Sequence, residues 1–191
     1  MRAPKITIRS ARVEDAATIA CAVAMAIGDK EALRAYCGND YMAVLTQIAA
    51  TKGTQYSWQY ALVAEVDGTA AGAVVGYDGD DLQPLREGTF AIVRQLTGRV
   101  PNIANETEGG EYYLDSVGVL PEFRGLNVGR TLVREFCNKV FATQHNCVGL
   151  IVDSNNPQAE KLYTSLGFER VGTRLFFGHR MWHLQLRDNK L

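Results

Sequence analysis

Two arginines and two glycines between positions 124 and 130 have the types and spacing of an anion-binding turn. Arg124 and Gly125 are followed by Gly129 and Arg130, just before a segment with helical hydrophobic periodicity. The first turn of a helix presents unpaired backbone N–H groups and a partial positive charge. Glycine lets a phosphate group approach the main chain closely, and arginine supplies forked donors for phosphate oxygens. These residues predict a diphosphate site, although an ordinary turn with two surface arginines explains this segment alone equally well.

A predicted strand and a predicted helix position this turn. The strand covers residues 111–119, and Pro121 ends its sheet pairing because proline has no N–H to donate. The helix covers residues 128–141 and carries its apolar side chains along one face. The segment contains neither the Lys-Ser/Thr of a P-loop nor a G-x-G-x-x-G motif, so the two common nucleotide-binding motifs are not predicted.

Two motifs in this half of the chain resemble those of the GNAT superfamily of N-acetyltransferases. V-x-V-L-P-E-F-R-G-L-N-V-G, from Val117 to Gly129, is similar to that family's acetyl-coenzyme A signature, R/Q-x-x-G-x-G/A after a strand. NNPQAEKLYTSLGFERVG, from Asn155 to Gly172, is similar to its motif N-x-x-A-x-x-L-Y-x-x-x-G-F. Asn127 departs from the first motif, where the family usually has glycine. Asparagine tolerates left-handed backbone dihedrals, so we expect the turn to be kept.

The resemblance implies that acetyl-CoA is a co-substrate held mainly by the main chain. The end of the predicted strand would pair with the pantetheine arm as an added strand does, and a backbone N–H near Val117 would face the thioester oxygen. The turn would hold the pyrophosphate. The cofactor-binding residues that the resemblance implies are Val117, Gly118, Val119, Arg124, Gly125, Leu126, Asn127, Val128, Gly129, Arg130, Asn156, Ala159 and Tyr163.

Acetyl transfer to an amine needs a base for the amine proton and an acid for the leaving thiolate. By resemblance, Tyr163 is the general acid, although its place in a helical apolar stripe also suits a plain core residue. Glu111 and Asp115 share the strand face of Val117 and are the candidate bases. A purely solvated carboxylate, or one bonded to a neighbouring hydroxyl such as that of Ser116, is an equally open interpretation of each.

Other nucleophiles and ligands are weaker candidates. His179 and His183 near the last strand are better explained as structural histidines, and only three histidines are scattered along the chain, so no metal site is expected. A covalent acetyl-cysteine route through Cys137 or Cys147 is not expected either.

The resemblance also implies an α/β fold: one mixed, mostly antiparallel sheet of about seven strands with helices on both faces, and a central parallel pair splayed to admit the cofactor. Apolar patterning predicts strands at 5–12, 55–66, 69–77, 111–119, 147–152, 168–174 and 180–186. Helices are predicted at 14–27, 31–51 with a break at 37–40, 84–96, 128–141 and 156–166. Asp67-Gly68 predicts a type I′ hairpin turn. We expect residues 1–191 to form a single N-acetyltransferase domain.

Residues 100–110 predict an irregular loop that we expect to fold over the acceptor site. Glu106 and Glu108 lie in this loop and Glu111 follows it. Three acids so close together favour a cationic acceptor.

Composition narrows the class of protein. A hydrophobic share of 47%, a charged share of 21% and a formal net charge of -1 are typical of a soluble globular protein. The absence of a basic run argues against nucleic-acid binding, and no apolar run approaches a membrane span of about 20 residues. The first residues lack an apolar signal-peptide region, and the four cysteines lack paired spacing. We therefore expect a cytoplasmic protein with reduced thiols, without a membrane partner.

Taken together, the sequence predicts an acyl-CoA-dependent N-acetyltransferase that moves an acetyl group from acetyl-CoA to a primary amine by direct nucleophilic attack. Its acceptor would be a small amine or a peptide or protein amine, and a homodimer is left open. The alternative is a non-catalytic acyl-CoA-binding regulatory module with the same fold.

Overall fold

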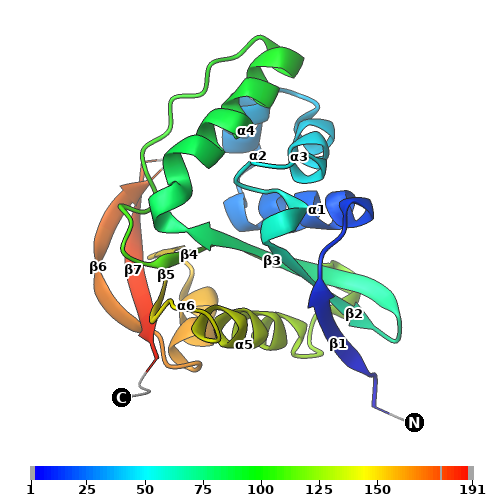
Figure 1. Ribbon diagram of the computed structural model, residues 1–191, viewed down its shortest axis with the longest axis vertical. Coiled ribbons are helices and arrows are strands. Elements are labelled where there is room, and N and C mark those ends of the chain that lie inside the picture. The colour runs from blue at the N-terminus through cyan, green and yellow to red at the C-terminus, as the bar shows by residue number, and fades with distance from the viewer. Residues whose placement is uncertain (1–2, 177, 189–191) are drawn as a thin grey trace.

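The computed structural model describes residues 3–176 and 178–188. Its centre is a seven-stranded sheet in the order β1-β2-β3-β4-β5-β7-β6, which crosses the middle of the molecule in Figure 1. β4 and β5 are parallel, and all other neighbouring strands are antiparallel, as predicted. The strands are β1 (Ile6–Ser10), β2 (Ala61–Val66), β3 (Thr69–Asp78), β4 (Tyr112–Val119), β5 (Cys147–Asp153), β6 (Glu169–Phe176) and β7 (His179–Arg187).

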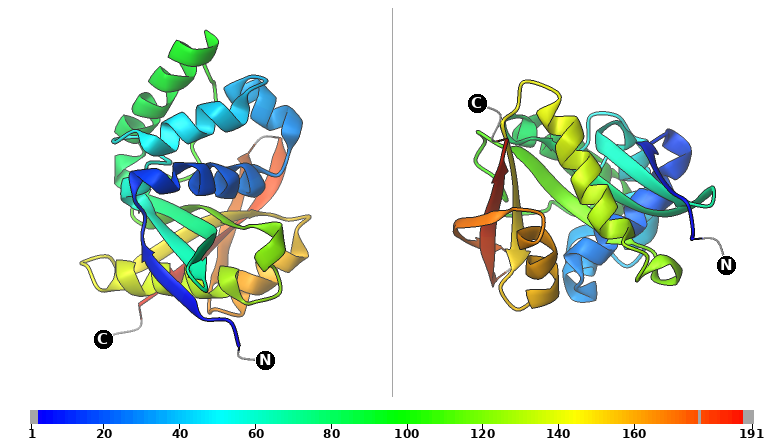
Figure 2. Two further views of the ribbon diagram at one scale, coloured as in Figure 1. Left: turned by 90° about the vertical axis from the view of Figure 1, so that its right-hand side faces the viewer. Right: turned by 90° about the horizontal axis from the view of Figure 1, so that it is seen from below.

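Helices cover both faces of the sheet, as the two orientations in Figure 2 also show. One face carries α1 (Ala16–Ile27), α2 (Lys30–Cys37), α3 (Tyr41–Ala50) and α4 (Leu82–Thr97). The other face carries α5 (Val128–Phe141), which crosses the strands diagonally, and α6 (Pro157–Thr164). The predicted break between residues 37 and 40 is confirmed, because Gly38 has a positive φ and separates α2 from α3.

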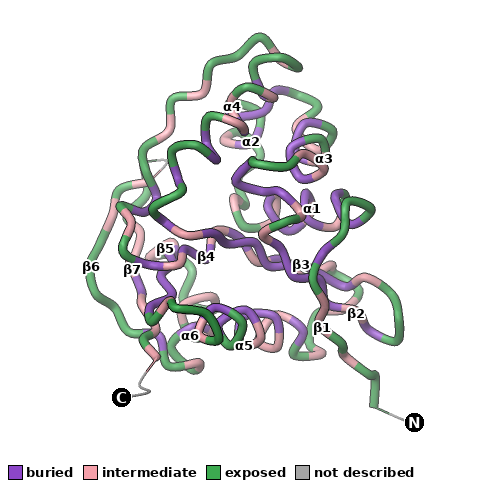
Figure 3. Tube along the Cα trace, in the orientation of Figure 1, coloured by how far each residue is buried: buried purple, intermediate pink, exposed green. Residues whose placement is uncertain are grey.

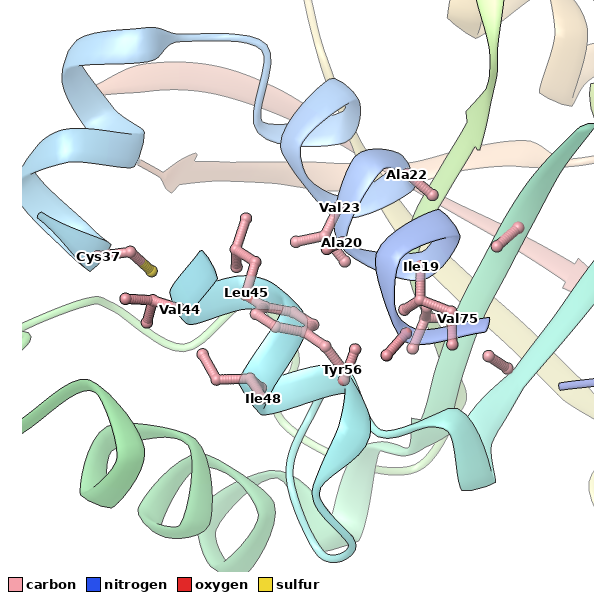
Figure 4. Close-up of a cluster of buried hydrophobic side chains, with 14 of the residues drawn as sticks. Ile19, Ala20, Ala22, Val23, Cys37, Val44, Leu45, Ile48, Tyr56 and Val75 are labelled. Atoms are coloured by element: carbon pink, nitrogen blue, oxygen red, sulfur yellow. The ribbon is translucent and has the colours of Figure 1, made fainter. Parts of the chain in front are cut away.

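Each face has its own apolar core. Figure 3 shows the buried segments gathered along the sheet and on the helix sides that face it. Above the sheet, α1 and α3 pack together against β2 and β3, and Figure 4 shows Ile19, Val23, Leu45 and Ile48 meeting there. The burial of such side chains contributes about 1.5–3 kcal/mol each. Below the sheet, α5 and α6 pack against the opposite face with the side chains of Leu132, Val133, Phe136, Val148, Leu150 and Leu184.

The hairpin of β2 and β3 is confirmed at its turn and corrected at its start. Asp67 and Gly68 both have positive φ values, 49° and 85°, as a type I′ turn requires. The strand predicted from residue 55, however, begins only at Ala61. Residues 58–60 form a short 3-10 helix, because the Ser57 side chain accepts a hydrogen bond from the Gln59 N–H and bends the chain. The alternation of aromatic and polar residues before Ala61 was therefore wrongly interpreted as strand.

The parallel pair separates almost as soon as it forms. Only Tyr112 pairs with Val148 and Tyr113 with Gly149, after which β4 remains paired with β3 alone. β4 also contains a bulge: Leu114 pairs with Gly76 and the residue two positions on with Val75, which leaves Asp115 as the extra residue. A bulge redirects the side chain that it carries. The predicted splayed pair is thus confirmed, and Asp115 lies at its opening.

In the part of the chain that the structure describes, no helix combines the length and the apolar character that crossing a membrane requires.

Candidate active site

A cavity of about 890 Å³ opens where β4 and β5 separate. β4 lines it from Tyr113 to Val119 and β5 from Leu150 to Asp153, while α1, α2 and α4 close the opposite side. The cavity brings together eight of the predicted catalytic and cofactor-binding residues: Asp115, Val117, Gly118, Val119, Gly129, Asn156, Ala159 and Tyr163.

The predicted anion-binding turn, residues 124–130, lines a second cavity of about 240 Å³. Gly125 and Asn127 have left-handed φ values of 81° and 62°, so asparagine keeps the turn as expected. The N–H of Thr131 donates to the Asn127 carbonyl at 3.0 Å. The amides of the first turn of α5 that precede it therefore have no intrahelical acceptor. Their position suits an anion.

The side chains of the turn are fixed at both flanks. Arg124 lies close to the Val119 carbonyl, with Nε at 3.4 Å, and Arg130 donates to the Ser165 hydroxyl at 2.6 Å. Leu126 differs from the other predicted cofactor residues, because it lines neither of the two cavities and packs only against the core below the sheet. It supports the turn from behind. Asn156 caps α6 by accepting a hydrogen bond from the Ala159 N–H at 3.1 Å, so this motif residue has a structural task of its own.

Gly118 is required by the packing of α1 on β4. A Cβ at this position would lie 2.5 Å from the Cα of Ala22, a distance that side chains do not reach. The absence of a side chain lets α1 rest directly on the strand beside the cavity. The main chain of β4 is therefore held firmly where it borders the opening.

Tyr163 belongs to the core and to the cavity at once. It is 8% exposed and packs edge-on against Phe168 with ring centroids 5.8 Å apart. Burial raises the pKa of its phenol above the ordinary value, which keeps it protonated at neutral pH. Tyr163 therefore fills the core below the sheet and also lines the cavity. Its role as the general acid stays a prediction.

Asp115 lies in the cavity wall as part of a buried polar network. Its Oδ2 accepts a hydrogen bond from the Tyr77 hydroxyl at 2.9 Å, and its Oδ1 accepts one from the Ser116 hydroxyl at 2.7 Å. Burial, together with the nearby carboxylate of Glu106, raises the pKa of Asp115 to about 7. A carboxyl group with such a pKa can accept a proton near neutral pH, which an ordinary aspartate cannot do efficiently.

The sequence did not reveal the rest of this network. Glu106 is 5% exposed and forms an ion pair with Arg86 of α4. It also accepts a hydrogen bond from Gln55 Nε2 at 2.7 Å and lies 3.1 Å from the Tyr77 hydroxyl. Burial raises the pKa of Glu106, whereas Arg86 opposes that rise. These residues come from four separate segments, so no local motif could have identified them.

Glu111 is directed away from the opening. Its carboxylate accepts hydrogen bonds from Gln185 Nε2 at 2.7 Å and from the Thr107 hydroxyl at 3.0 Å, and it lies 2.9 Å from His183 Nε2. Burial acts to raise the pKa of Glu111, but the bonds from His183 and Gln185 outweigh it and lower that pKa. The Glu111 carboxylate packs against the backbone of Gly149, and a side chain at position 149 would collide with it. Glu111 is not among the described residues that line the cavity.

Two of the three acids expected to attract a cationic acceptor are paired with an arginine. Glu106 pairs with Arg86, and Glu108 with Arg174 at 3.1 Å. The charges of these two acids are compensated within the protein, so they do not support a preference for a cationic acceptor.

The remaining candidates occupy structural positions. His179 lines the cavity and lies 3.3 Å from Asp153. Burial raises the pKa of the Cys37 and Cys137 thiols to about 12, and no cysteine is among the described cavity-lining residues. Among residues 3–176 and 178–188, no group of three His, Cys, Asp or Glu side chains is placed to hold a metal ion.

Comparisons with known proteins agree with this geometry. The sequence model of the acetyltransferase (GNAT) family matches residues 31–168. The crystal structure of an acetyltransferase superposes on this chain with a TM-score of 0.80 at 31% identity, and the match covers 95% of this chain and 98% of that acetyltransferase. The Salmonella typhimurium protein yncA, solved with its cofactor acetyl-CoA, has the same fold, with a TM-score of 0.62 at 19% identity over 97% of this chain and 95% of its own.

A curated relative matches over a shorter segment. N-alpha-acetyltransferase RimI of Mycobacterium tuberculosis is 42% identical over 64 residues, which is 34% of this chain. The match spans 39% of the length of RimI.

Proposed function

This chain belongs to the acetyltransferase (GNAT) family, and we propose that it transfers an acetyl group from acetyl-CoA to a primary amine. One observation carries the proposal: a single cavity extends from Gly129, at the start of α5, to Asp115 in the bulge of β4. Gly129 also lines the second cavity, beside the turn 124–130. This shared residue supports a ligand whose diphosphate binds at the helix start and whose other end reaches the carboxyl group of Asp115. That arrangement fits a long thioester carrier whose reactive end must meet a second substrate.

The main chain would hold the carrier. The amides of the turn 124–130 would bind the diphosphate, with charge from Arg124 and Arg130. Beyond its two pairs with β5, the edge of β4 at Val117–Val119 has no partner strand on that side among the residues that the structure describes. Such an edge can pair with the amide groups of the pantetheine arm. This supports the cofactor assignment that the motifs imply.

Asp115 is the base that we propose in preference to Glu111. An alkyl amine is mostly protonated at neutral pH, since its pKa is about 10.4. Asp115 would take the ammonium proton, and the free amine would attack the thioester carbonyl. As the C–S bond breaks, the coenzyme A thiolate would take a proton from Tyr163. The nitrogen of the new C–N bond would give up its second proton, which returns the Tyr163 phenolate to its neutral form. Asp115 lines the cavity and has a raised pKa, and both observations support this role. The carboxylate of Glu111, in contrast, is hydrogen-bonded to Gln185 of β7.

The acceptor end of the cavity favours an amine carried on an apolar body. Aromatic and aliphatic side chains from α2, α4, β6 and β7 form its wall, together with loop residues, and Glu106 beside it is paired with Arg86. A small aromatic or aliphatic amine and a peptide terminus with an apolar first residue both fit this lining. The wall residues are Tyr36, Tyr56, Phe90, Ile103, Phe176 and Met181.

Acetyl-CoA should raise the thermal midpoint of the protein. A ligand that binds only the folded state stabilises it by about 2.7 kcal/mol at a concentration 100 times Kd. Thermal melts with and without millimolar acetyl-CoA, followed by thiol-release assays with a panel of amines, test the proposal in two steps. No shift would remove the cofactor assignment. A shift without turnover on any amine would favour the non-catalytic regulatory module.

Tyr163→Phe should lower kcat by about 10²-fold or more, because loss of a general acid has that size. The Kd for coenzyme A, measured by calorimetry, should change little, since phenylalanine keeps the ring packed against Phe168. Phe168→Leu is a suitable packing control, as it disturbs the same contact and leaves the phenol in place. If the two variants lose turnover to the same extent, Tyr163 acts only through packing.

A further inference from the structure

The hydroxyl of Tyr77 lies between two buried carboxylates and can donate its proton to only one of them. It is 2.9 Å from Oδ2 of Asp115 and 3.1 Å from Oε1 of Glu106. Gln55 Nε2 donates to both the Tyr77 oxygen, at 3.1 Å, and Glu106 Oε1, at 2.7 Å. Tyr77 itself is 1% exposed, and burial raises the pKa of its phenol well above the ordinary value, so the hydroxyl keeps its proton.

Two hydrogen-bond patterns satisfy this arrangement. When Asp115 is ionised, the Tyr77 hydroxyl donates to Asp115, and Glu106 keeps its bonds from Arg86 and Gln55. When Asp115 is protonated, its own O–H donates to the Tyr77 oxygen, and Tyr77 donates to Glu106. The second pattern ends on the carboxylate of Glu106, which forms a direct ion pair with Arg86. When Asp115 takes up a proton, the Tyr77 hydroxyl therefore changes its acceptor from Asp115 to Glu106, and Asp115, Tyr77 and Glu106 all remain hydrogen-bonded.

Charges from several elements act on Asp115. Glu106, in the loop before β4, is the nearest negative group, and Arg86 on α4 is the positive group that faces it. The other titratable groups around it are uncharged phenols. They come from α2, the segment before β2, β3 and β4, and they are Tyr36, Tyr56, Tyr77 and Tyr113.

We propose that Glu106 and the Tyr77 hydroxyl, which lies between Glu106 and Asp115, are positioning groups that together set the protonation equilibrium of Asp115. The inference deepens the proposed function, in which Asp115 accepts the proton of the amine. The negative charge of Glu106 makes ionisation of Asp115 harder, which strengthens Asp115 as a base. Tyr77 acts in the opposite direction, because its hydroxyl stabilises the ionised form of Asp115.

The two groups can be separated because their removal moves Asp115 in opposite directions. Glu106→Gln should lower the pKa of Asp115 by about one unit or more, since a like charge has been removed. Tyr77→Phe should raise it, because the ionised carboxylate loses a donor. A purely structural role would reduce activity in both variants without moving the pKa in opposite directions. The acidic limb of kcat/KM against pH should follow the same two shifts.

The measurement is a carbon NMR titration of the full chain labelled at the aspartate carboxyl carbons, without substrates. Asp115→Asn identifies the resonance of Asp115 by its disappearance. Because Glu106→Gln leaves Arg86 buried without its ion pair, Arg86→Gln/Glu106→Gln serves as the second variant; it removes both charges and should shift the pKa in the same direction by less. An Asp115 resonance that titrates as in the wild type in the Glu106 and Tyr77 variants would overturn the proposal. The expected NMR shifts without acetylation of any amine would instead count against the proposed function alone.

Discussion

Asp115→Asn should lower kcat about 10²–10⁴-fold while the Kd for acetyl-CoA stays close to the wild-type value. A general base contributes a rate factor of this size, and asparagine keeps the shape of the side chain without its basicity. Single-turnover assays at pH 8, with coenzyme A affinity from calorimetry, measure both quantities. Glu111→Gln is the matched comparison, because it makes the same chemical change at a carboxylate that is hydrogen-bonded to Gln185 of β7.

The stability of the Asp115 variant separates lost chemistry from lost folding. The pKa of Asp115 is raised in the folded protein to about 7, above its unfolded value. Between that unfolded value and pH 7, the folded state binds a proton that the unfolded state does not bind, so stability falls as pH rises through this window. Above pH 7 the ionised carboxylate destabilises the folded protein. Asp115→Asn should therefore melt at an equal or higher temperature than the wild type at pH 8. A lower midpoint, or full activity, would remove Asp115 from the proposed mechanism.

Arg86→Met should cost about 3–5 kcal/mol of stability, because it leaves the Glu106 carboxylate buried without its cation. Arg86 also donates to Asn105 Oδ1 at 2.7 Å and to the carbonyls of Ile103 and Ala104, so it fastens α4 to the loop beside the cavity. For a chain of this size, the loss corresponds to a midpoint lower by about 6–20 °C. Chemical denaturation at pH 7.5 gives the free energy of unfolding directly.

Two further variants sharpen this result. Arg134→Met removes an exposed arginine from a pair with Glu135 whose side chains are 55% and 39% exposed, and it should change stability by at most about 1 kcal/mol. Arg86→Met/Glu106→Met removes both buried charges and should recover much of the loss. Equal losses of stability in Arg86→Met and Arg134→Met would show that the buried Arg86–Glu106 pair contributes no more to stability than an exposed pair.

The parts of the site that are continuous in sequence were predictable. The turn at 124–130 follows a strand and opens a helix within a few residues, so glycine and arginine types at fixed spacing were informative. Asn127 has the left-handed dihedrals that its side chain tolerates. The strand pair and its separation followed from the resemblance and from the apolar run at 147–152. Local chemistry thus predicted the turn and the helix start beside the cavity.

The network around Asp115 could not be predicted because tertiary packing assembles it. Strand alternation alone places Glu111 and Asp115 on one face and cannot distinguish them. The distinction depends on the bulge in β4 and on Gln185 and His183, which reach Glu111 from β7. Packing likewise overrode pattern before Ala61. A run with strand-like alternation became a turn there, and Gln55 at its start extends inward to Glu106.

The brief contact between β4 and β5 has a mechanical consequence. β1 to β4 form one group of paired strands, and β5 to β7 form another. Among the described residues of the sheet, only the pairs at Tyr112 and Tyr113 join the two groups. A bound carrier would lie between the separated parts of β4 and β5 and add hydrogen bonds there. It would thus connect the two groups of strands where the chain itself does not. Filling this space would therefore stiffen the sheet across its middle, so that the loaded protein resists shear between its two halves better than the empty one.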